Sequence, residues 1–131
     1  MTLTNAQLEL LMLVPKALGW WRPGRKALAR AGYGAFSESL SPADLCEYLR
    51  QHPTERRAWE QYSEDKRGAG WYLLNENGIA RVAYIQRPEW TTAFTDPAVA
   101  CAEYIVRECE SLYGGTLRWQ HKPAAHPPAA S

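Results

Sequence analysis

Hydrophobic and polar positions are most clearly ordered between residues 70 and 85. Apolar and aromatic side chains dominate residues 71–74 and return in residues 79–85, with the polar run Asn75-Glu76-Asn77-Gly78 between them. Asn and Gly tolerate the positive φ angles that a tight hairpin connection requires. The pattern therefore predicts two antiparallel strands joined by a turn at Asn77-Gly78.

A helical pattern begins shortly after this hairpin. Asp96 is a suitable N-cap, and Pro97 suits the first helical position, where no backbone donor is needed. We expect the apolar stripe of this helix to pack on the hairpin, and it consists of Ala98, Cys101, Ala102, Ile105, Cys109 and Leu112. We expect the charged residues Glu103, Arg107 and Glu110 to face solvent.

The N-terminal half carries further helix signals. Thr4-Asn5-Ala6-Gln7 matches a capping box, and Pro15 breaks or kinks the helix that follows. Ser41-Pro42 starts another helix, which Pro53 ends, and a further helix is expected at about residues 54–64. The side chains expected to face the core from these last two helices are Leu45, Tyr48, Leu49, Ala58, Trp59 and Tyr62.

The order of elements indicates an α+β fold. N-terminal helices, the hairpin, the long amphipathic helix and a short third strand at residues 116–119 would form a small antiparallel sheet covered by helices. We expect residues 1–120 to form a single globular domain, with Gly114-Gly115 ending the long helix. Residues 121–131 are rich in Pro and Ala and are expected to be a disordered tail.

Composition adds few constraints on function. The 131-residue chain has a formal net charge of +1, which gives no global attraction to nucleic acid or to an anionic membrane. Its longest purely apolar run, residues 10–14, is far shorter than the roughly 20 residues that span a bilayer. Three cysteines, an odd number, fit a reducing compartment, so we expect a cytoplasmic protein.

The sequence contains no strong signature of catalysis. Cysteines and histidines are too scattered for a metal site, and only Cys46 and His52 lie close enough to form a Cys–His nucleophile. No orienting acid accompanies that pair, and buried cysteine is the better reading for all three thiols. We therefore expect no metal, no cofactor and no enzymatic activity.

A basic segment allows a different reading. It lies beside Trp20 and Trp21, contains no acidic residue, and consists of Arg22, Arg25, Lys26 and Arg30. Such a segment could track a phosphate backbone with aromatic stacking and make the chain a weak nucleic-acid-binding domain. A solvated helix face explains these residues more simply, because the total charge is nearly neutral.

A second group of features favours protein binding. The pattern of residues 63–67, 70–72, 82–84, 96 and 100–105 carries a resemblance to a known class of protein. Over about residues 60–112, this chain resembles the small cytosolic immunity proteins of bacterial toxin systems. The resemblance implies a non-enzymatic inhibitor that neutralises a cognate toxin by direct binding. An interaction module or a structural subunit of another assembly is the alternative, and the oligomeric state is left open.

The expected binding site lies in two charged segments that flank the hairpin. Because antiparallel strands return the chain to its starting end, the turn before the first strand and the segment after the second should be neighbours. Trp90 is expected to act as an exposed aromatic anchor. The predicted partner-binding residues are Glu64, Asp65, Lys66, Arg67, Arg87, Glu89 and Trp90. Pairing of Asp65 with Arg67, or capping of a helix end, is the alternative role of the turn.

Overall fold

A computed structural model describes residues 4–12, 15, 41–66 and 68–112. Helices come first along the chain, followed by a three-stranded antiparallel sheet of order β1-β2-β3 and a last long helix. This arrangement confirms the predicted α+β fold. The elements are α1 (Asn5–Met12), α5 (Pro42–Gln51), α6 (Pro53–Asp65), β1 (Trp71–Glu76), β2 (Ile79–Tyr84), β3 (Arg87–Phe94) and α7 (Pro97–Leu112).

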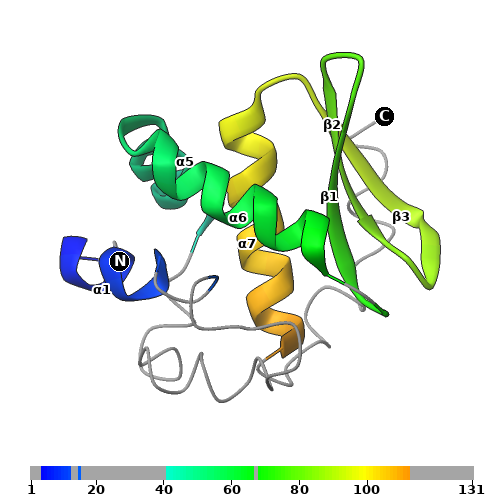
Figure 1. Cartoon of the computed structure of the whole chain (residues 1–131), viewed down its shortest axis with the longest axis horizontal. Helices are drawn as coiled ribbons and strands as arrows, with labels where there is room; N and C mark the ends of the chain where they lie inside the picture. The colour runs from blue at the N-terminus through cyan, green and yellow to red at the C-terminus, as the bar shows by residue number, and fades with distance from the viewer. Residues whose placement is uncertain (1–3, 13–14, 16–40, 67, 113–131) are drawn as a thin grey trace.

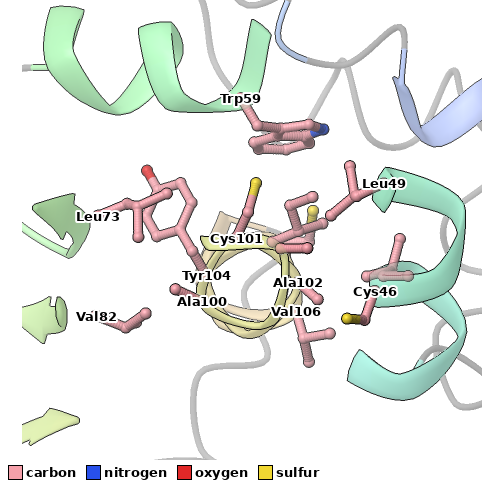
Figure 2. Packing of buried hydrophobic residues seen from close by; sticks show 14 of the residues in the cluster. Cys46, Leu49, Trp59, Leu73, Val82, Ala100, Cys101, Ala102, Tyr104 and Val106 are labelled. Atoms are coloured by element: carbon pink, nitrogen blue, oxygen red, sulfur yellow. The ribbon is translucent and has the colours of Figure 1, made fainter. Parts of the chain in front are cut away.

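Helix α7 lies in the middle of the described fold. It packs against α5 on one side and against the sheet on the other, and α6 crosses above it (Figure 1). Figure 2 looks almost along α7, with Leu73 and Val82 of the sheet on one side, Trp59 of α6 above, and Leu49 of α5 opposite the sheet. The core therefore contacts α7 on the sheet side, on the α6 side and on the α5 side rather than along one face only.

The helices begin where the capping signals place them. The Thr4 hydroxyl accepts a hydrogen bond from the Gln7 N–H at 3.1 Å, and the Gln7 side chain accepts one from the Thr4 N–H at 2.9 Å, which completes the predicted capping box. The Ser41 hydroxyl accepts from the Asp44 N–H at 3.3 Å. Asp96 accepts from the Ala98 N–H at 2.9 Å, as predicted for an N-cap.

The hairpin also forms as predicted. Asn77 and Gly78 have φ angles of 52° and 80°, and the strands pair directly from Glu76 opposite Ile79. A left-handed conformation at both central residues matches the twist of the flanking strands. The two-residue connection thus sets the register of β1 against β2.

The third strand of the sheet is β3, which the sequence pattern missed. Pro88 and the charged residues Arg87 and Glu89 are unfavourable in a strand, so the sequence did not predict one here. The pairing of β3 with β2 is also irregular, since Val82 lies opposite Thr92 but Tyr84 opposite Arg87. The strand expected at residues 116–119, the Gly114-Gly115 helix end and the tail at residues 121–131 lie outside the described residues. Much of the expected domain between residues 16 and 40 lies outside them too.

Helix α7 is more deeply buried than its pattern suggested. Arg107, expected in solvent, is only 3% exposed, and the neighbouring Glu108 is 0% exposed. The Arg107 guanidinium lies 5.1 Å from the centre of the Trp71 ring and 3.2 Å from a Glu103 carboxylate oxygen. The expectation for Arg107 was wrong because its side chain lies against the sheet, where it also donates to the Thr92 hydroxyl of β3 at 3.5 Å. Glu103 and Glu110 are partly exposed.

The small side chains of α7 let α5 approach closely, which makes an added side chain costly. Ala102 is fully buried and faces Leu49 and Cys46 in Figure 2. We expect Ala102→Leu to lower the free energy of unfolding by about 1–3 kcal/mol through overpacking. Chemical denaturation measures this loss. Ala43→Leu, on the exposed side of α5, is the matched control and should change stability little; an equal loss in both variants would contradict the packing argument.

Asp96 gives the fold a specific pH dependence. The hydrogen bond from Arg50 and the helix-capping bond from Ala98 lower the pKa of Asp96 below its ordinary value of 3.8. A lowered pKa in the folded state stabilises the fold above the ordinary pKa, and this contribution is lost as pH falls through the folded value. We expect Asp96→Asn, which keeps the cap acceptor, to lower Tm most near neutral pH. The Tm difference should vanish in strong acid; a constant difference would show that charge is not its cause.

Candidate protein-binding surface

The chain before β1 and the chain after β2 meet at one end of the sheet. The Ile85 N–H donates to the Gly70 carbonyl at 3.0 Å, and the Gly70 N–H donates to Oε1 of Gln86 at 3.1 Å. Trp71 pairs with Tyr84, and Tyr84 with Arg87, at this same end of the sheet. Figure 1 shows α6 ending beside it. The antiparallel return thus brings Gly70, before the first strand, against Ile85 and Gln86, after the second; direct contact between residues 64–67 and 87–90 stays a prediction.

Glycine is required at the point of contact. Gly70 has a φ of 111°, a conformation that residues with a Cβ rarely adopt. A Cβ atom at this position would lie 2.8 Å from Nζ of Lys66. The positive φ therefore requires glycine here, and an added side chain would also displace the Lys66 ammonium group.

The exposed charges at this end come from both segments. Glu64 and Asp65 are exposed in the last turn of α6, and Asp65 accepts a hydrogen bond from Gln61 at 3.1 Å. The side chains of Arg87 and Glu89 are 60% and 61% exposed and lie 3.5 Å apart. The side chains of Glu64, Asp65, Arg87 and Glu89 are all exposed to solvent, so a partner could contact them.

Ile85 adds an apolar side chain that the sequence reading did not select. It is 52% exposed in the turn between β2 and β3, beside the charged residues. Its place just after the second strand is the signal that could have identified it, because connections between strands lie at the surface. We call the set formed by Glu64, Asp65, Ile85, Arg87 and Glu89 the loop-end surface.

Trp90 is not the exposed anchor that the sequence suggested. It is only 7% exposed, because it shares the parity of Thr92 and points from β3 toward the covered face of the sheet. Its ring stacks on Trp71 with centroids 6.2 Å apart and planes 23° apart. The Arg87 guanidinium lies 5.6 Å from the Trp90 ring centre. Trp90 therefore packs against the exposed Arg87 from the interior and is not itself a surface residue.

Lys66 is likewise part of the interior. Its Nζ donates to Oε1 of Glu108 and to the Trp71 carbonyl, each at 2.8 Å. The second Glu108 oxygen accepts from the Tyr62 hydroxyl at 2.6 Å. Burial, followed by the charge of Glu108, raises the pKa of Tyr62, so the phenol stays protonated as the donor. Lys66 thus joins the end of α6 to β1 and α7, and its side chain is only 11% exposed; its predicted contact with a partner stays a prediction.

The remaining sequence candidates do not add a site within the described chain. Arg67 and the basic segment from Arg22 to Arg30 lie outside the described residues. Burial raises the pKa of the Cys46 thiol, and His52 is turned toward Tyr48, with its Nδ1 2.9 Å from the Tyr48 carbonyl and the rings stacked at 4.0 Å. In the part of the chain that the structure describes, no three His, Cys, Asp or Glu residues group as metal ligands would.

Comparison with known proteins leaves the family of this chain open. No protein-family model, curated protein or solved structure matches it. Among the helices of the described residues, none has the length and apolar character needed to cross a membrane.

The buried ion pair beneath the loop-end surface can be tested by removing its charges singly and together. Lys66→Met leaves the Glu108 carboxylate buried without a cation and should cost about 3–5 kcal/mol of unfolding free energy. Lys66→Met with Glu108→Gln removes both charges and keeps an acceptor for Tyr62, so stability should return close to wild type. Chemical denaturation measures both variants. A double variant as unstable as Lys66→Met would contradict the assignment of the cost to the uncompensated charge.

Proposed function

We propose that this protein is a non-enzymatic inhibitor that binds another protein, as a cytoplasmic immunity protein binds its toxin. The loop-end surface makes the contact. The observation that carries the proposal is the tie at one end of the sheet, where Gly70 is hydrogen-bonded to Ile85 and to the Gln86 side chain. The chain on each side of this tie carries exposed charges, and Ile85 itself is exposed.

Preorganisation supports this function. Binding through flexible loops loses conformational entropy, and a surface ordered before contact avoids much of that loss. Here the loops are tied to the sheet, Arg87 rests on Trp90, and Lys66 holds the end of α6 to the core. The surface thus presents its charges in defined positions to a partner.

The mixture of charges favours a protein partner of complementary charge. The loop-end surface carries the acidic Glu64, Asp65 and Glu89 and the basic Arg87, and Ile85 adds an exposed apolar side chain. Protein interfaces combine an apolar core with a charged rim that is complementary to the partner.

The resemblance to immunity proteins supports the specific form of the proposal. It covers about residues 60–112, a range that contains the whole loop-end surface. An immunity protein would occlude the active site of its toxin or block activation of the toxin. Its gene would stand next to one for a large secreted protein with a variable C-terminal domain.

The experiment pairs this chain with the C-terminal domain of such a neighbouring gene product. Co-expression should relieve the growth arrest that the domain causes, and the two purified proteins should form a complex. Asp65→Lys with Glu89→Lys should raise Kd at least about 30-fold, equivalent to about 2 kcal/mol. Calorimetric titration measures Kd, and a thermal melt verifies that the variant is folded.

The control carries the same change of charge elsewhere. Glu47→Lys with Glu76→Lys reverses two exposed carboxylates, one on α5 and one at the hairpin end of the sheet. Its Kd should remain near that of wild type. Equal weakening by both double variants would point to nonspecific attraction, and unchanged affinity in the folded Asp65→Lys/Glu89→Lys variant would refute the placement of the site.

A further inference from the structure

The two edge strands of the sheet, β1 and β3, differ in how far they are protected from pairing with another strand. At β1, the Ser63 hydroxyl accepts from the Leu73 N–H at 2.8 Å and lies 3.2 Å from the Leu73 carbonyl, to which it donates. Lys66 donates to the Trp71 carbonyl at 2.8 Å. Side chains of α6 therefore satisfy the backbone groups that an added strand would use, and the β1 edge is closed.

The β3 edge has features that disfavour strand addition only in its first half. Arg87, Pro88 and Glu89 place two charges and a proline there, and the irregular pairing with β2 falls in the same region. All of these features discourage strand addition. Beyond them, residues 90–95 read Trp-Thr-Thr-Ala-Phe-Thr, an uncharged run of mostly β-favouring residues. The sheet order ends at β3, and no other described element extends the sheet beyond this strand.

We propose that this edge binds a second copy of the chain, with residues 91–95 of the two copies paired antiparallel about Ala93. In a two-fold pairing the residue on the axis meets its own counterpart, so a charge at that position would face a like charge. Residues 90–95 contain none, which makes the segment compatible with itself.

The arrangement of helices leaves room for the second copy. A two-fold axis perpendicular to the sheet places both copies of α7 on the same face of a six-stranded sheet. Helix α7 lies mainly over β1 and β2 and less over β3, so the rim at β3 is the least covered part of that face. On the opposite face Ala93 is small and exposed, and it offers no bulky obstacle.

Self-association of the purified protein tests this proposal without any other partner. Sedimentation and light scattering over a range of concentrations should show a monomer–dimer equilibrium. Ala93→Lys places like charges near the axis and should raise the dimer Kd at least about tenfold. Leu74→Lys is the matched control, because it puts the same charge on the same sheet face beside the closed edge, and its Kd should equal that of wild type.

Hydrogen exchange identifies the edge directly. Backbone amides in residues 91–95 that point away from β2 should gain protection as the protein concentration rises, and Ala93→Lys should abolish that gain. A wild-type protein that stays monomeric at every concentration overturns the proposal, as does equal dissociation of Ala93→Lys and Leu74→Lys. Concentration-independent protection of these amides in a monomer also overturns it, because another part of the same chain would then cover the edge.

Discussion

The described fold depends on the burial of α7 on nearly every side. Small residues such as Ala100 and Ala102 let neighbouring elements approach the helix closely, and the sheet, α5 and α6 then leave it almost no solvent face. A helix in this position must find internal partners for its polar side chains, since an unpaired buried charge costs several kcal/mol. Glu108 meets Lys66 and Tyr62, and Arg107 meets Glu103 and the Trp71 ring.

These internal partners also place the elements relative to one another. Lys66 leaves the end of α6, contacts Glu108 on α7 and reaches the Trp71 carbonyl on β1, so one ammonium group joins three elements. Ser63, one turn earlier, satisfies both backbone groups of Leu73. The last turn of α6 thereby takes the place of a neighbouring strand, which explains how a helix can lie against a sheet edge without leaving buried backbone groups unpaired.

Sequence reasoning succeeded where a local interaction decides the structure. Asn77-Gly78 forms its turn, and Asp96 and the Thr4–Gln7 box cap their helices, because each feature involves residues close together in the chain. It failed where burial depends on distant elements. Arg107 has a polar side chain at a position that only the assembled sheet and helices enclose, and β3 is a strand only because β2 offers it a pairing edge. For the candidate site, the contact of Gly70 with Ile85 and Gln86 followed from strand direction alone, whereas the burial of Lys66 and Trp90 did not.

The misplacement of Lys66 and Trp90 has a common physical origin that bears on the candidate site. Both residue types can contact a partner or support the surface that does, and the sequence does not distinguish these uses. Trp90 lies beneath Arg87, and Lys66 lies beside Gly70 at the junction of the two segments. A short loop with so few apolar residues of its own cannot hold its shape unaided, because ordering each residue costs about 1–2 kcal/mol. The aromatic stack and the buried ion pair supply that order from the core, so the rigidity of the loop-end surface derives from the same interactions that enclose α7.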